Sequence, residues 1–150
     1  MSLHAYSRCW LHLTWGTLER RPMLQGASAP ELSRYLTAYT PTKGIYLKIN
    51  YVNADHAHLL IDLPANLSIA EVVQLFKGSS SHWVNESGRV PGKFGWARGY
   101  GAFSVSQSAV EEVAACIANQ QEHHRRRTFA EELKAFAEKY GLKWHEDESR

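Results

Sequence analysis

Two histidines stand one residue apart in the apolar run "NADHAHLLIDLP", residues 53–64. In a β-strand, side chains two residues apart point to the same face, so His56 and His58 would lie side by side. Two imidazoles can chelate one cation, and imidazole suits zinc, manganese, iron or nickel better than magnesium. A His-x-His pair alone is a weak signal, because alternating polar and apolar residues are ordinary in a half-buried strand. Two imidazoles also leave the coordination shell incomplete, so a third ligand must come from elsewhere.

The other face of this predicted strand is apolar. The row that points away from the histidines consists of Ala57, Leu59, Ile61 and Leu63. This alternation predicts a strand that is buried on that side. The histidine face then carries either metal chemistry or merely solvent-exposed polar groups.

The third ligand is sought on a predicted helix that runs from Ala109 to about His124. One stripe of this helix holds side chains that could bind a cation or act as nucleophiles: Glu112, Cys116, Gln120 and His123 or His124. This stripe is separate from the apolar stripe of Val110, Val113 and Ile117. The alternative interpretation is a solvated helix face that happens to include a cysteine.

The overall charge gives little sign of a polyanionic partner, because 17 basic and 15 acidic residues leave a net charge of +2. Local clusters are more informative. The segment "HHRRR", residues 123–127, brings together Arg125, Arg126 and Arg127, which could contact phosphates or simply complement the dipole of a solvated helix end. Lys93, in a glycine-rich segment with Arg89 and Arg98, would contact a nucleic-acid backbone rather than specify bases.

Large aromatic residues are a second possible contact with nucleic acid. Trp83, Trp96 and Tyr100 could stack on unpaired bases. Aromatic residues spaced through helices and strands are, however, more often part of a core.

The strands and helices that must position these residues are predicted from hydrophobic periodicity and from the places of glycine, proline and helix-capping residues. Strands are predicted over residues 6–17, 45–52, 56–63 and 93–106, the first half-buried and the last bent at its glycines. A helix is predicted from Ser28 to a point before Pro41. Three further helices are predicted to begin at capping boxes that start at Ser68, Ser108 and Thr128, and the last would end at Gly141.

The predicted order is therefore β-α-β-β-α-β-α-α. This order predicts an α+β fold: a ferredoxin-like split β-α-β antiparallel sheet with helices on one face and extra C-terminal helices. A chain of 150 residues suits one domain, residues 1–150. We expect no membrane segment and a cytoplasmic location, since no run is long and apolar enough and Cys9 and Cys116 form no disulfide framework.

Three segments together resemble a known family: "HLTWGT" at 12–17, "ADHAHLLI" at 54–61 and "CIANQQEHHRRRTFAEE" at 116–132. They are similar to the small one-tyrosine transposases of the HUH superfamily, of the insertion-sequence-two-hundred type. The chain resembles the REP-associated tyrosine transposases more distantly. The likeness covers most of residues 8–144 and also includes "GYGAFSVS" at 99–106.

The resemblance implies a site and a set of partners. His56 and His58 would bind one divalent cation, Mg or Mn, and Gln120 would complete the site. Lys77 matches a basic position of the family's second helix and would contact DNA. Family members are homodimers that bind single-stranded or hairpin DNA at element ends, and they cut and rejoin strands. They do this through a phosphotyrosine intermediate, so no nucleotide cofactor is needed.

The chain departs from the family at the nucleophile, because Cys116 stands where the tyrosine is expected. A thiolate is shorter than a phenolate and a poor match for a phosphodiester. Three interpretations follow: a metal- and DNA-binding protein that does not cut, an enzyme that uses another tyrosine such as Tyr100 or Tyr140, or a nuclease that uses water. A module that no longer binds DNA is a further alternative. We favour the first.

Overall fold

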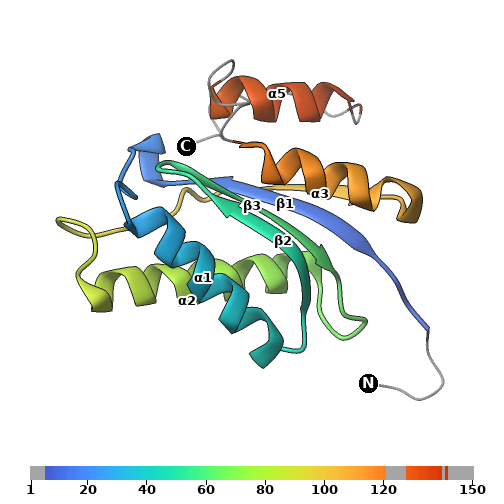
Figure 1. The fold of residues 1–150 in the computed structure, drawn as a ribbon, viewed down its shortest axis with the longest axis horizontal. Helices are drawn as coiled ribbons and strands as arrows, with labels where there is room; N and C mark the ends of the chain where they lie inside the picture. The colour runs from blue at the N-terminus through green and yellow to red at the C-terminus, as the bar shows by residue number, and fades with distance from the viewer. Residues whose placement is uncertain (1–5, 121–127, 140, 142–150) are drawn as a thin grey trace.

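A four-stranded antiparallel sheet forms the centre of the protein (Figure 1), as seen in a computed structural model that describes residues 6–120, 128–139 and 141. Its strands are β1 (Trp10–Gly16), β2 (Tyr46–Val52), β3 (His56–Asp62) and β4 (Gly101–Val105). They lie in the order β2-β3-β1-β4, with every neighbouring pair antiparallel. This interleaved order is that of the predicted split β-α-β fold, which is thereby confirmed.

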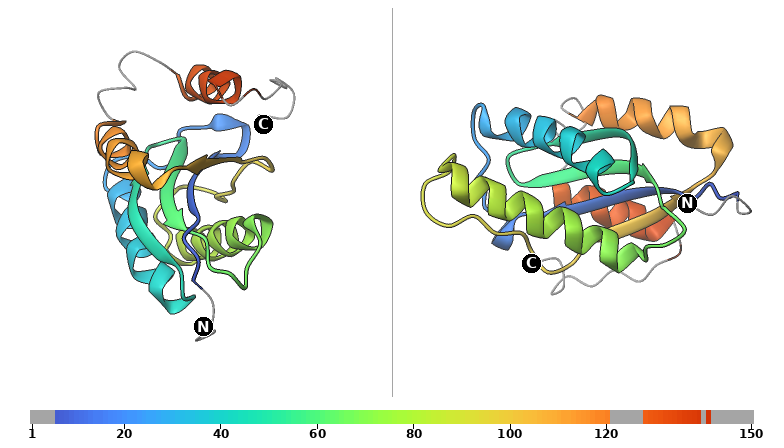
Figure 2. Two further views of the ribbon diagram at one scale, coloured as in Figure 1. Left: turned by 90° about the vertical axis from the view of Figure 1, so that its right-hand side faces the viewer. Right: turned by 90° about the horizontal axis from the view of Figure 1, so that it is seen from below.

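Helices cover both faces of the sheet. The two helices that connect the strands, α1 (Ser28–Thr42) and α2 (Ile69–Ser87), lie on one face, as predicted. The C-terminal helices α3 (Val110–Ala118) and α5 (Phe129–Lys139) lie on the other, above the sheet in Figure 1, and the left view of Figure 2 shows α5 on the far side of the sheet from α2. The sheet is therefore the middle layer of three.

The larger core lies between the sheet and the connecting helices. The predicted row of Ala57, Leu59 and Ile61 on β3 points into this core, as do alternate residues of β1. The helices contribute Leu32, Leu36, Val73 and Phe76. Burial of this apolar surface is the main stabilising term for the fold.

A smaller core lies on the opposite face, where Trp10 and Leu60 of the sheet pack against Val110 and Ile117 of α3. The prediction of a half-buried first strand is therefore wrong, since every residue of β1 is buried. The idea that the histidine face is merely solvent-exposed is wrong for the same reason. The C-terminal helices exclude water from it.

Three helix boundaries differ from the prediction, and one is the end of α3, which lies at Ala118 and not near His124. Helix α1 continues through Pro41 to Thr42, although it was expected to end before the proline. In the last turn a proline removes only one backbone donor, and the Thr40 hydroxyl donates to the Thr37 carbonyl, which that donor would have reached. The capping box predicted at Ser108 is wrong as well, because residues 107–109 form a 3-10 turn and α3 starts after Ala109 with no side-chain cap among the described residues.

Two other caps are confirmed. At the start of α2, the Ser68 hydroxyl accepts from the Glu71 N–H, and the Glu71 carboxylate accepts from the Ser68 N–H. At the start of α5, the Thr128 hydroxyl accepts from the Glu131 N–H at 3.2 Å. Each cap satisfies backbone donors that the first helical turn leaves unpaired.

The strand predicted over residues 93–106 is shorter than predicted, because only Gly101–Val105 form β4 and residues 93–100 contribute just the isolated bridge between Trp96 and Thr17. The close backbone approach expected at a glycine is found at Gly101. A Cβ on Gly101 would lie 3.1 Å from Thr14 Cγ2 and 3.2 Å from Leu133 Cδ1. The absence of a side chain thus lets β1, β4 and α5 approach each other closely.

Candidate metal centre

His56 and His58 are the first and third residues of β3, and their rings lie together on the face covered by α3 and α5. The ring centroids are 5.0 Å apart and the planes are nearly perpendicular, at 87°. Only 1% of His56 and 0% of His58 is exposed. Two buried imidazoles in this arrangement need polar partners, because an unpaired buried polar group is costly.

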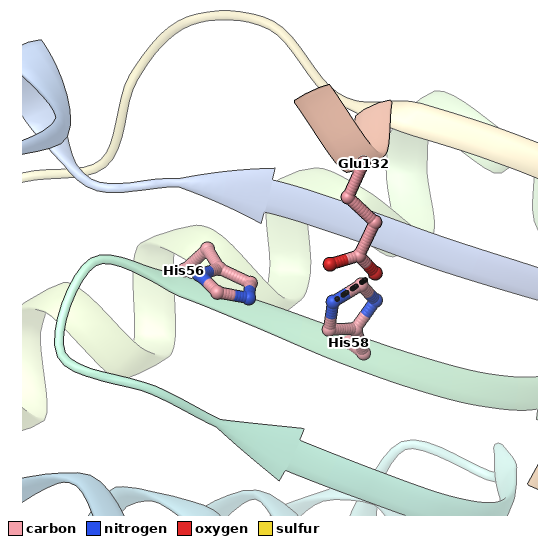
Figure 3. Close-up of side chains that lie close together, drawn as sticks. All are labelled: His56, His58 and Glu132. Carbon is pink, nitrogen blue, oxygen red and sulfur yellow. Dashed lines mark ion pairs between the residues drawn. The ribbon is translucent and has the colours of Figure 1, made fainter. Parts of the chain in front are cut away.

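A carboxylate from α5 completes the cluster. Candidate ligand atoms of His56, His58 and Glu132 all lie within 4.8 Å of one another, and all three residues are buried. Glu132 Oε1 is 3.2 Å from His58 Nε2. Figure 3 shows the carboxylate descending from the helix to the two rings on the strand.

The other nitrogen of each ring is held by a neighbouring side chain. His56 Nδ1 lies 2.6 Å from Asp55 Oδ1, and His58 Nδ1 lies 2.9 Å from His12 Nε2. These contacts leave Nε2 as the atom that each ring can offer to a cation. Partners of this kind fix the tautomer and orientation of metal-binding histidines.

His12 suits the role of a neutral partner. Burial is the main reason that the pKa of His12 is lowered to about 3, the nearby His58 lowers it further, and Glu132 opposes the change. A neutral His12 can accept a hydrogen bond at Nε2 from a protonated His58 Nδ1.

The donor set fits a divalent cation. Two imidazole nitrogens and one carboxylate oxygen are ligands that zinc, manganese and iron accept in proteins. The residues that would hold the ion are therefore His56, His58 and Glu132, with Asp55 and His12 behind the two rings.

Packing holds α5 over this cluster. The Phe129 ring stacks on His56 with centroids 4.4 Å apart and planes at 16°. A Cβ on Gly16 would lie 3.0 Å from Phe129 Cε2, so the glycine leaves the space that the ring needs. The Arg20 guanidinium lies 5.8 Å from the centroid of the same ring.

Of the residues predicted on α3, Glu112 and Cys116 are not part of the three-residue cluster. Gln120 lies just beyond the end of the helix and is 1% exposed. Its Nε2 donates to the Cys116 carbonyl at 3.4 Å, and its Oε1 has no hydrogen-bond partner within the described part of the chain. Cys116 is half-buried and forms no disulfide within the described residues, and Glu112 is exposed. The predicted His123 and His124 lie outside the described residues.

The predicted basic residues differ in their availability. The Lys77 ammonium donates to the carbonyls of Ala97, Arg98 and Gly99, at 2.8, 3.1 and 2.8 Å. A contact between Lys77 and phosphate would have to displace one of these carbonyls. Lys93 is exposed. Arg125, Arg126 and Arg127 lie outside the described residues.

Of the three predicted stacking residues, two are packed into the protein. Trp83 stacks on Tyr35, with centroids 4.8 Å apart. Trp96 donates to the Ser80 hydroxyl at 2.8 Å and packs against Phe94. Tyr100 is 43% exposed. Tyr140, the other predicted alternative nucleophile, lies outside the described residues.

Sequence reasoning identified His56 and His58 but missed Glu132, the third member of the cluster, and the residues behind the two rings, His12 and Asp55. The strand register supplies the missing signal for His12, which pairs with Leu60 while Thr14 pairs with His58. His12 and His58 are thus diagonal neighbours on one face. Glu132 stands in no sequence spacing that would connect it with the histidines.

In the described residues, we find no helix that is both long and apolar enough to cross a membrane.

Comparison with known proteins identifies a matching family and solved structures of similar fold. Residues 5–120 match the family described as Transposase IS200 like. A crystal structure assigned as a transposase from Deinococcus radiodurans is 23% identical, with a TM-score of 0.63 over 80% of this chain and 96% of that one. A REP-associated tyrosine transposase bound to a REP hairpin is 13% identical, with a TM-score of 0.60 over 83% of this chain and 74% of that one.

A search of curated proteins gives no match. The family match covers most of the sequence and includes both histidines of the cluster. The chain belongs to the IS200-like transposase family.

Proposed function

We propose that this protein binds hairpin single-stranded DNA at the ends of an insertion element, together with one divalent cation, Mg or Mn, and that its strand cleavage is impaired. The observation that carries the proposal is the buried cluster of His56, His58 and Glu132. Buried imidazoles and a carboxylate at this spacing are suited to a cation. A bound cation would offset negative charge on the phosphate of a DNA strand.

Several features support DNA as the partner. The family is one of transposases, and the REP-associated relative was solved with a hairpin. On this chain, Tyr100 offers an exposed ring for an unpaired base, and Lys93 is exposed in the same glycine-rich segment. Arg125, Arg126 and Arg127 would add phosphate contacts, and we propose a homodimer as the binding form.

The proposal of impaired cleavage depends on Cys116. A thiol reaches less far than a phenol from the same helix position. An S-phosphoryl ester would also have to form while an alkoxide leaves, for which a thiolate is poorly matched. The chain's remaining residues can therefore bind and orient a strand without providing the nucleophile for its transfer.

A denaturing gel tests this proposal. Labelled single-stranded hairpin DNA and manganese are incubated with the protein as it stands, with Cys116→Tyr and with the matched ring variant Cys116→Phe. We expect a covalent protein–DNA adduct with the tyrosine variant only, and its loss when His56→Ala is added. A native gel should show that the unaltered protein, Cys116→Tyr and Cys116→Phe all shift the hairpin.

The opposite outcomes point to other functions. If the unaltered protein cuts DNA with an adduct, one of its side chains, Cys116 included, is a competent nucleophile; if it cuts without one, water is the nucleophile. Either result overturns impaired cleavage. If no hairpin is bound at physiological salt, the chain is an interaction module that does not use DNA, and the DNA-binding proposal is wrong.

A further inference from the structure

We infer that Glu132 is the third protein ligand of the cation and that its coordination fastens α5 to the sheet. The inference rests on the metal site of the proposed function. It assigns to that site a residue outside the region that matches the family, which ends at residue 120.

Burial and geometry carry the assignment. Glu132 is 7% exposed, and its carboxylate lies 3.2 Å from His58 Nε2 within the three-residue cluster. A buried carboxylate beside two imidazoles, with the candidate ligand atoms within 4.8 Å of one another, is an arrangement that can hold a divalent cation. A divalent cation among the three side chains would be bound by two imidazole nitrogens and one carboxylate oxygen.

The rest of α5 is arranged to present this carboxylate. Phe129 and Glu132 are three residues apart and so share one face of the helix. Phe129 stacks on His56, and Leu133 approaches Gly101. Thr128 caps the first turn. The helix cap, the aromatic contact with His56 and the Glu132 carboxylate therefore all lie within about the first one and a half turns of α5.

Glu132 and Gln120 differ in what they can supply. The resemblance assigned the third position to Gln120, whose Nε2 donates to the carbonyl of Cys116 in α3. An amide oxygen is a neutral ligand, whereas the carboxylate of Glu132 neutralises part of the charge of a divalent cation. A carboxylate with two histidines is also a familiar ligand set for catalytic zinc.

Coordination by Glu132 has a structural consequence. The ligands would come from β3 and α5, so a bound ion would join two elements that are separated in sequence. Preferential binding to the docked state stabilises that state. Manganese should therefore protect the backbone amides of α5 from hydrogen exchange.

The experiment measures manganese affinity by calorimetry and the exchange of α5 amides with and without manganese. The full chain is compared with Glu132→Gln, with the matched control Glu138→Gln on the exposed side of α5, and with His56→Ala. We expect Glu132→Gln to weaken manganese binding at least about tenfold and to abolish the manganese-dependent protection of α5. Glu138→Gln should retain both.

Additional variants keep the result decisive. Glu132→Asp, which retains the charge on a shorter side chain, should bind manganese with intermediate affinity and serves if Glu132→Gln is poorly folded by circular dichroism. If Glu132→Gln binds as tightly as the unaltered chain while His56→Ala does not bind, the inference is overturned and the proposed metal site stands. If the unaltered chain binds no manganese, the metal site itself is wrong and the inference falls with it.

Discussion

His12 Nε2 lies 2.9 Å from His58 Nδ1 and connects β1 to β3 on the face that carries the candidate ligands. The two residues are diagonal neighbours in the antiparallel register, since His12 pairs with Leu60 and His58 with Thr14. The contact fixes the orientation of the His58 ring from the side opposite Glu132. His12 therefore acts on the site through His58.

Replacing His12 should weaken metal binding without removing a ligand. We expect His12→Leu to lower manganese affinity by roughly 10- to 100-fold, the usual effect of losing the partner of a metal-binding histidine. His12→Gln retains a hydrogen-bonding side chain and should lose less. Calorimetric titration with manganese measures both, and equal affinity in the two variants and the unaltered protein would show that the contact has no effect on the site.

Gly16→Ala tests the docking of α5. The new Cβ would lie 3.0 Å from Phe129 Cε2 and 3.5 Å from the Asp55 carbonyl oxygen, so the ring that stacks on His56 must move. We expect a loss of about 1–3 kcal/mol in the free energy of unfolding, typical of overpacking, together with weaker manganese binding. Urea unfolding and calorimetry measure the two effects.

Gly78→Ala is the matched control. Gly78 lies within α2, and a Cβ there would meet no atom within 4 Å among the described residues. Alanine is favoured over glycine inside a helix, so the variant should gain about 0.5–1 kcal/mol in stability with unchanged manganese affinity. If Gly16→Ala also gained stability and kept its manganese affinity, the Phe129 ring would not be packed against Gly16 and His56.

The fold was predictable because each element carries a local signal. The alternation in β3 predicted its apolar row, and the capping box at Ser68 predicted the start of α2. The capping box predicted at Ser108 was wrong, because the same sequence pattern is compatible with a 3-10 turn. Local propensity does not decide between these conformations when the preceding strand fixes the path of the chain.

The site was predictable only where its residues are neighbours in sequence. His56 and His58 share one face because they are two residues apart. Glu132 joins them only because α5 packs across the opposite face of the sheet from the connecting helices, and no sequence period encodes that placement. The burial of His12 also depends on the packing of the C-terminal helices on this face. The alternation of residues in its strand predicted that the face would be exposed to solvent.

Lys77 should give the stability of the protein a distinctive dependence on pH. Burial lowers the pKa of Lys77 to about 8 from its ordinary value of 10.5. Between these pH values the unfolded chain keeps a proton that the folded chain has released, so the free energy of unfolding rises with pH. This contribution is complete above pH 10.5 and is lost as the pH falls through about 8.

Comparison with Lys77→Met isolates the effect, because the other titrating groups are common to both chains. We expect the difference in unfolding free energy, unaltered chain minus variant, to increase between pH 8 and 10 in urea titrations. A difference that stays constant over this range would mean that the three carbonyls of residues 97–99 hold the ammonium protonated in spite of its burial.

Tyr100 should contribute to DNA affinity by stacking. It is 43% exposed and has the Lys77 ammonium 5.8 Å from its ring centroid, whereas Trp83 and Trp96 are held by packing. Stacking of one base on an aromatic ring contributes about 1–3 kcal/mol, so Tyr100→Ala should weaken single-stranded hairpin binding roughly 5- to 150-fold.

Fluorescence anisotropy at several salt concentrations separates stacking from charge. Because Tyr100→Ala removes no cation, the dependence of affinity on salt should keep its slope, whereas Lys93→Ala should reduce that slope. Tyr46, 56% exposed on the edge strand β2, provides the matched control, and Tyr46→Ala should leave affinity unchanged. Equal losses of DNA affinity in the two tyrosine variants would show that the glycine-rich segment before β4 contributes no more to binding than strand β2 does. The bound DNA would then have to contact the sheet edge at β2 as well.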